Sequence, residues 1–221
     1  MTSLQPFPEP LITGMQMTEE EFLRRWESLP ELKNAELIEG VVYVGSPVSR
    51  RHSKRDSQLL SWLYFYAIAT PGCEAGSNST WSMMGSLPQP DCDLRILPES
   101  GGQSKEAGEF CGVAPELAVE VCLSSTQHDF GPKLALYQRA GVREYITLEE
   151  ARQKVVWRSL EAGSYVAMEP GDDRVLRSKV FPGLWLDVDA MWSDDGVRMM
   201  AVLQQGLATP EHAAFVERLK P

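Results

Sequence analysis

One segment restricts the possible folds more than any other, because it is almost continuously apolar over seven residues. Residues 117–123 read LAVEVCL. Such a run is typical of a strand that is buried on both faces at the centre of a sheet. Its one carboxylate, Glu120, is costly to bury unless it is paired or bound to a cation. The segment therefore predicts a central strand and, on that strand, a site that needs positive charge.

The segments on either side alternate between helical and strand patterns. Helices are expected at about 18–29, 49–69 and 127–141, and again after residue 186. Strands are expected in a hairpin at 35–44, within 73–84 and 87–97, at 142–148, and as an antiparallel pair at 154–158 and 164–167. Residues 98–112 are expected to form a loop. This order favours one mixed α/β domain.

We divide the chain into a lead-in segment at 1–16, a domain at 17–190 and a C-terminal helical tail at 191–221. The tail carries apolar residues at positions that suit either an interface between copies or packing within the same chain. The pattern favours neither interpretation. These residues are Met199, Met200, Val202 and Leu203.

The composition excludes several classes of protein. The 221 residues include 21 Lys and Arg and 31 Asp and Glu, which gives a net charge of −10. A chain this acidic is not a bulk nucleic-acid coat protein, although it can carry a local basic surface. Four cysteines without a C-x-x-C pair, and three histidines, argue against a structural zinc site. The start of the chain does not resemble a secretory signal, and the densest apolar stretch, 62–69, is too short to span a bilayer. We expect a cytoplasmic protein without a membrane partner.

Asp91 is a second candidate for the site, since it lies 29 residues before Glu120 at the start of a neighbouring strand. Two carboxylates that converge at strand ends can hold a hard cation such as Mg²⁺. The alternative is a salt bridge between Glu120 and Arg95 or Lys133. Asp93 shares the strand and the side of Asp91 and could replace it as a ligand.

Lys133 follows Glu120 by 13 residues and falls in the first turn of the next expected helix. A strand-to-helix passage brings that turn close to the end of the strand. A cation at a helix start is unfavourable to the helix dipole, so an anionic partner is expected there. Tyr137 lies four residues later and shares the face of Lys133.

The expected helix at 49–69 begins with four basic residues, where the helix dipole disfavours positive charge. In an acidic chain, this cluster suggests contacts to DNA phosphates. The alternative is a solvated face that pairs with Asp56 and with surface glutamates. The four residues are Arg50, Arg51, Lys54 and Arg55.

Taken in order along the chain, these residues resemble the Uma-two family of restriction endonucleases, within the PD-(D/E)XK nuclease superfamily. The resemblance runs from about residue 17 to about 190, and its most specific part lies between 120 and 145. It is carried by Glu36-Leu37-Ile38-Glu39-Gly40, His52, Pro90-Asp91, Val119-Glu120-Val121-x-x-Ser124, Asp129-x-x-x-Lys133-x-x-x-Tyr137 and Gly141-Val142-x-Glu144-Tyr145.

The resemblance implies a restriction-endonuclease-like fold, with a mixed β-sheet flanked by helices, and hydrolysis of phosphodiester bonds in DNA. Asp91 and Glu120 would hold one or two Mg²⁺ ions, or Mn²⁺, with help from the backbone carbonyl of Val121. Glu36, on or beside the first helical segment, would hold a second ion or orient water. A lysine near the attacking water would orient it and offset negative charge.

The chain departs from the superfamily pattern at one position. The lysine usually comes two residues after the glutamate, where this chain has Cys122. The resemblance suggests that Lys133 takes over this role from the helix. Two histidines are weaker candidates: His52 matches a family position but suits a helix surface as well, and His128 could contact a phosphate.

Two other functions stay open at this point. The chain could be a catalytically inactive nuclease-fold protein that acts in DNA binding or oligomeric assembly, or a hydrolase that acts on another phosphate ester. A homodimer is expected, because cutting two antiparallel strands suits twofold symmetry.

Overall fold

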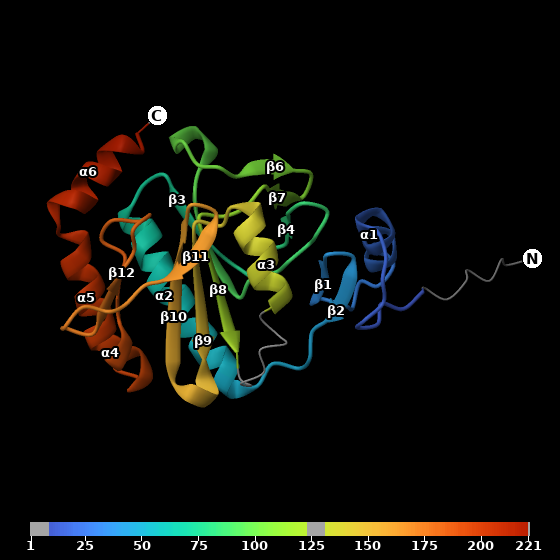
Figure 1. The fold of residues 1–221 in the computed structure, drawn as a ribbon, viewed down its shortest axis with the longest axis horizontal. Helices are drawn as coiled ribbons and strands as arrows, with labels where there is room; N and C mark the ends of the chain where they lie inside the picture. The colour runs from blue at the N-terminus through green and yellow to red at the C-terminus, as the bar shows by residue number, and fades with distance from the viewer. Residues whose placement is uncertain (1–8, 123–130, 221) are drawn as a thin grey trace, which may run out of the picture.

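A six-stranded mixed sheet forms the centre of the molecule in a computed structural model that describes residues 9–122 and 131–220 (Figure 1). The strand order is β11-β10-β9-β8-β5-β3. The neighbours β8 and β9 are parallel, and the other pairs are antiparallel. The strands are β3 (Cys73–Ser77), β5 (Cys92–Ile96), β8 (Leu117–Cys122), β9 (Glu144–Glu149), β10 (Lys154–Glu161) and β11 (Ser164–Ala167). The expected mixed sheet is therefore confirmed.

Helices α2 (Arg50–Ala69) and α3 (Gly131–Ala140) cover opposite faces of this sheet (Figure 1). Side chains of β8 alternate between the two faces, as the pleat of a strand requires. Val119 packs into the core beneath α2, whereas Ala118 packs against residues of α3. Glu120 lies on the α3 side for the same reason. The strand pattern thus decides which helix meets the buried carboxylate.

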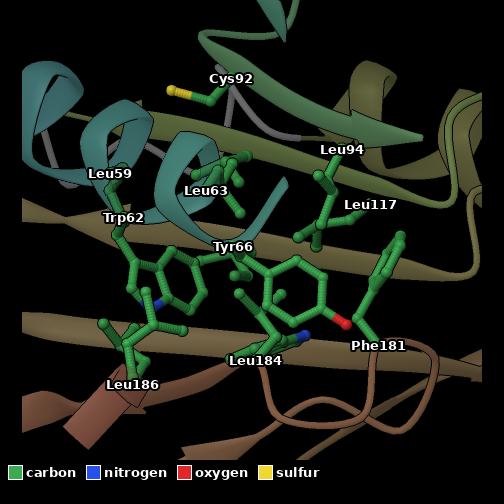
Figure 2. Packing of buried hydrophobic residues seen from close by; sticks show 14 of the residues in the cluster. Leu59, Trp62, Leu63, Tyr66, Cys92, Leu94, Leu117, Phe181, Leu184 and Leu186 are labelled. Atoms are coloured by element: carbon green, nitrogen blue, oxygen red, sulfur yellow. The ribbon is translucent and has the colours of Figure 1, made fainter. Parts of the chain in front are cut away.

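The larger core lies beneath α2. Figure 2 shows Trp62 and Tyr66 of α2 pointing toward Leu184, Leu186 and Phe181. Both aromatic side chains also satisfy their polar atoms, since the indole N–H of Trp62 donates to the Trp185 carbonyl (2.9 Å) and the Tyr66 hydroxyl to the Pro182 carbonyl (2.9 Å). Burial of these rings and leucines supplies a large share of the apolar stabilisation of the fold.

The C-terminal helices pack within the chain. They are α4 (Val188–Trp192), α5 (Gly196–Leu207) and α6 (Pro210–Arg218), and they follow the β12 (Val175–Arg177) and β13 (Trp185–Asp187) hairpin. Met199, Leu203 and Phe215 are buried in the same cluster as Trp62. Of the two interpretations of the tail, packing on the same chain is the one that the structure has. The domain boundaries at 16/17 and 190/191 stay a prediction.

Two glycines allow the close approach of this C-terminal layer. A side-chain carbon on Gly206 of α5 would overlap the backbone of Gly183, and one on Gly183 would meet the carbonyl oxygen of Gly206 at 2.7 Å. Gly183 also has a φ of +88°, which other residues rarely adopt. Both positions therefore require glycine.

The N-terminal part contributes α1 (Glu19–Glu27) and the hairpin of β1 (Ala35–Ile38) and β2 (Val41–Val44). Thr18 caps α1 by accepting a bond from the backbone N–H of Glu21 (3.3 Å). The hairpin turns at Glu39 and Gly40, whose positive φ angles of 52° and 78° are typical of a two-residue hairpin loop. These elements confirm the expected helix and hairpin.

Residues 98–112 are not a loop throughout, which corrects the prediction. They form the 3₁₀ turn η1 (Pro98–Ser100) and the strands β6 (Lys105–Ala107) and β7 (Phe110–Gly112). Strand β7 also pairs in parallel with β4 (Trp81–Ser82). A second 3₁₀ turn, η2 (Glu150–Arg152), joins β9 to β10. Strands of two or three residues are too short to show an alternating pattern. Across residues 9–122 and 131–220, no helix is long and apolar enough to cross a membrane.

Candidate functional site

A cleft of about 590 Å³ opens where the end of β8 meets the starts of α2 and α3 and the β1–β2 hairpin. It collects residues that are far apart in the sequence. The charged and polar residues that line it include Glu36, His52, Asp91, Glu120, Val121 and Lys133. All four predicted catalytic residues therefore lie in the same cleft.

Glu120 is the deepest carboxylate of the cleft, with 8% of its surface exposed. Its Oε1 atom accepts two bonds, one from Lys133 Nζ (2.8 Å) and one from the Tyr137 hydroxyl (2.9 Å). Both donors come from α3, one turn apart. The predicted shared face of Lys133 and Tyr137 is confirmed, and the salt bridge forms with Lys133. Arg95, the other candidate partner, pairs with Glu74 instead (2.5 Å).

Lys133 lies in the first turn of α3, and its ammonium contacts three oxygens. Besides Glu120, it forms an ion pair with Glu36 Oε1 (2.7 Å) and donates to the Gln89 carbonyl (3.3 Å). Burial alone would lower the pKa of Lys133, but the two carboxylates raise it well above its ordinary value. Lys133 is therefore a permanent cation at neutral pH.

Glu36 reaches the cleft from strand β1. The sequence had suggested a place on or beside the first helical segment, and the structure corrects this: α1 ends at Glu27. Glu36 Oε1 also accepts the backbone N–H of Gln89 (2.6 Å). The β1–β2 hairpin is thereby joined to the turn that precedes Asp91.

Asp91 immediately precedes β5 and is held by two donors. Its Oδ2 accepts the backbone N–H of Val121 (2.6 Å), and its Oδ1 lies 3.3 Å from His52 Nε2. This hydrogen bond raises the pKa of His52 above its ordinary value, in opposition to burial. Asn78, with a φ of 52°, donates its backbone N–H to the carbonyls of Pro90 (3.2 Å) and Asp91 (3.3 Å). The turn that carries Asp91 is thus fixed by backbone contacts.

The charges of the cleft do not balance. Four carboxylates, those of Glu36, Asp56, Asp91 and Glu120, line the cleft together with the one ammonium of Lys133, which contacts Glu36 and Glu120. Burial raises the pKa of Glu120; Lys133 counteracts this, while the charges of Asp91 and Glu36 add to it. Excess negative charge and an all-oxygen set of donors suit a hard divalent cation. Within the described residues, however, no three Asp, Glu, His or Cys side chains are placed to hold a metal ion together. Lys133 itself lies between Glu36 and Glu120.

The basic residues at the start of α2 separate into two groups. Arg50 and Arg51 are exposed, and Arg51 Nε lies 3.9 Å from Glu150 Oε1. Lys54 forms an ion pair with Asp194 (2.5 Å). Arg55 is only 5% exposed and bonds Glu150 (3.0 Å) and Asp194 (2.7 Å). The guanidinium of Arg55 therefore holds α2 to the C-terminal layer and does not face solvent, which corrects its predicted place among the DNA contacts.

Three other residues named from the sequence differ in where they lie. Asp93 is 3% exposed, packs against Gly76 and is not among the residues that line the cleft. Burial raises its pKa to about 7. Cys122 is buried and lines the cleft. His128 lies outside the described residues.

Sequence reasoning missed Gln89 and Asn78. Both act mainly through backbone atoms, which every residue type carries. One signal was present for Gln89, since it stands between Pro88 and Pro90. Prolines on both sides restrict the backbone and indicate a rigid turn next to Asp91.

The comparison with protein families assigns the chain. Residues 19–189 match the model of the Uma2 family, whose description is "Putative restriction endonuclease". The chain belongs to the Uma2 family. The match confirms the resemblance that the sequence motifs carry, and it covers all the cleft residues named above. No curated protein matches this chain.

A solved structure is similar to this Uma2 protein across most of its length. It is the crystal structure of a "putative nuclease belonging to DUF820" from Anabaena variabilis ATCC 29413. The TM-score is 0.62 at 20% sequence identity, and the alignment covers 80% of this chain and 98% of the other. At this identity the likeness shows a shared fold, and it confirms the expected fold class.

Proposed function

We propose that this Uma2 protein is a divalent-metal-dependent endonuclease that hydrolyses phosphodiester bonds in DNA. One observation carries the proposal: Glu36, Asp91 and Glu120 come from three parts of the chain and line one cleft together with Lys133. The description of the family, which names restriction endonucleases, supports the same reaction.

Asp91 and Glu120 would hold Mg²⁺ together with the backbone carbonyl of Val121. Glu36 would hold a second ion or orient a water. Mn²⁺ has the same preference for oxygen ligands and would serve as well. When bound, the cation supplies a water of lowered pKa and positive charge beside the phosphate.

Lys133 would supply a fixed positive charge for the reaction. Its ammonium is held in the cleft by the Gln89 carbonyl and by two carboxylates, so its position is defined before substrate arrives. From there it would orient the attacking water and offset the negative charge that grows on the phosphate. This role would replace the lysine that the superfamily usually has at the position of Cys122.

Arg50 and Arg51 would contact the DNA backbone. They are exposed at the start of α2, the helix that also contributes His52 to the wall of the cleft. Lys54 would add a weaker contact, because it is shared with Asp194. We further propose a homodimer, since two copies related by a twofold axis would address both strands of a duplex.

Thermal unfolding in the presence of Mg²⁺ or Mn²⁺ tests the proposal. A cation that binds only the folded state raises its stability by about 2.7 kcal/mol at a hundredfold excess over Kd. We expect this increase in wild type and in Glu106→Ala, which alters an exposed carboxylate on β6, but not in Glu120→Ala. Incubation with supercoiled plasmid should then show cleavage by wild type and no cleavage by Glu120→Ala. Equal stabilisation of all three proteins would contradict the metal site.

The role of Lys133 is tested separately. Lys133→Ala should keep Mn²⁺ binding and lose cleavage by about 10²-fold, by analogy with the loss of one donor to a developing oxyanion. A folded Lys133→Ala protein that cleaves at the wild-type rate would refute this role and leave the metal site intact.

A further inference from the structure

The carboxylate of Glu120 is held asymmetrically. Lys133 Nζ and the Tyr137 hydroxyl both donate to the same oxygen, Oε1. Among the described residues, no donor reaches Oε2. The described residues thus occupy one oxygen of this carboxylate twice and place no donor on the second oxygen.

Tyr137 makes this contact from a rigid position. It is fully buried, and its ring packs edge-on against Tyr145 with the ring centroids 5.2 Å apart. Its hydroxyl has one proton, which the 2.9 Å bond commits to Glu120. A rotation of the carboxylate that exchanged the two oxygens would have to break this bond and the ion pair to Lys133 together.

We propose that Tyr137 is a positioning residue that locks Oε1 of Glu120 into the protein and thereby presents Oε2 to a divalent cation. This inference rests on the proposed function and adds to it the group that orients the ligand. Hydrogen bonds to ligating carboxylates fix their orientation, and loss of such a partner typically costs 10- to 100-fold in metal affinity.

Tyr145 provides a matched control. Its ring lies beside that of Tyr137 and is equally buried, but its hydroxyl has no hydrogen-bond partner in the part of the chain that the structure describes. Tyr145→Phe and Tyr137→Phe therefore remove the same atom from the same aromatic cluster. Only Tyr137→Phe also removes a hydrogen bond to Glu120.

Calorimetric titration with Mn²⁺, without DNA, tests the proposal on wild type and both variants. We expect Tyr145→Phe to bind Mn²⁺ as wild type does, and Tyr137→Phe to bind about tenfold more weakly. A role in folding alone would lower the melting temperature of the metal-free protein and leave the affinity unchanged. Tyr137→Phe with wild-type affinity for Mn²⁺ would therefore overturn the inference while the proposed function stands. Absence of Mn²⁺ binding in wild type would overturn both.

A second measurement covers the case in which Tyr137→Phe does not fold. Wild type carrying 3-fluorotyrosine keeps the hydroxyls of Tyr137 and Tyr145, and ¹⁹F NMR can follow each ring, with single Phe variants of the other five tyrosines used to assign Tyr137. Mg²⁺ should shift the resonance of Tyr137 more than that of Tyr145. A Tyr137 resonance that Mg²⁺ leaves unshifted contradicts the inference.

Discussion

At the scale of single residues, the two buried carboxylic acids Glu120 and Asp93 differ in the groups that stabilise them. Glu120 is stabilised by Lys133 and Tyr137, whereas burial dominates at Asp93, although Trp81, Ser79 and the charge of Arg95 lower its pKa. The two acids lie on the same side of the sheet but serve different purposes. Glu120 belongs to the cleft, and Asp93 belongs to the packing around Gly76.

The pH dependence of stability should reveal Asp93. Burial raises the pKa of Asp93 from 3.8 to about 7 in the folded protein. The folded chain therefore holds this proton more tightly than the unfolded chain, so the contribution of Asp93 to stability is present at acidic pH and is lost as the pH rises toward 7. The free energy of unfolding of wild type, relative to Asp93→Asn, should fall by up to about 3 kcal/mol between pH 5 and pH 8. Urea unfolding at several pH values measures this difference.

The exposed substitution Asp172→Asn is the control for this series. Its difference from wild type should stay constant across the same pH range. A constant difference for Asp93→Asn as well would show that Asp93 stays ionised in the folded protein.

The pairing of Glu120 with Lys133 could be predicted from residue chemistry. A carboxylate in an apolar strand and an ammonium at a helix start each need a partner, and the chain brings them to one place. The contacts of Gln89 and Asn78 could not be predicted in this way, because they use backbone amides and carbonyls. The prediction that Arg55 contacts DNA was wrong for a related reason: its partners Glu150 and Asp194 are about 95 and 140 residues away in the sequence.

At the scale of elements, helix-capping residues and the alternation of side chains along strands predicted most of the helices and strands. Ser49 and Thr209 cap α2 and α6 through their hydroxyl oxygens, in positions where a polar side chain precedes an apolar pattern. The β6–β7 hairpin escaped prediction because three-residue strands contain too few side chains to show a period. Its place depends on pairing with β4, a contact between distant segments.

The contact of α5 with the segment before β13 predicts an unusual effect of a glycine substitution. Gly206→Ala would ordinarily stabilise a helix by about 1 kcal/mol. Here the added carbon overlaps the backbone of Gly183, so we expect a loss of stability of roughly 2 kcal/mol, in the range of other overpacked sites. Chemical denaturation gives the measurement.

Gly196→Ala, in the same helix, is the matched control. It has open space around it and should be neutral or slightly stabilising. If Gly206→Ala were also stabilising, the close approach of these two backbones would be refuted.

At the scale of the whole molecule, an acidic chain has to approach an acidic polymer. The net charge of −10 opposes the binding of DNA at long range. The exposed arginines at the start of α2 lie next to the cleft and would attract the phosphates locally.

The packing of the C-terminal tail could not be predicted from the sequence, because an apolar stripe has the same pattern whether it packs on its own chain or on another.

The salt dependence of DNA binding tests this local attraction. Each phosphate contact adds about 0.9 to the slope of log K against log salt concentration. Arg50→Ala combined with Arg51→Ala should therefore lower the slope by about 1.8, with weaker binding to all sequences alike. Fluorescence anisotropy with a labelled duplex in Ca²⁺, at several salt concentrations, provides the slope.

Lys220→Ala serves as the control, since Lys220 is exposed, follows α6 and is not among the residues that line the cleft. Its slope should equal that of wild type. An unchanged slope in the double arginine variant would place the DNA elsewhere on the surface.

The bond from the Val121 amide to Asp91 has a consequence for how this cleft can vary. The donor belongs to the main chain, and nineteen of the twenty amino acids would supply it equally well. Apolar replacements at position 121, which lies in the core beneath α2, can therefore change the neighbouring packing and still leave the carboxylate aligned. Proline is the one replacement that removes the proton, so it alone should disturb the geometry of Asp91 directly.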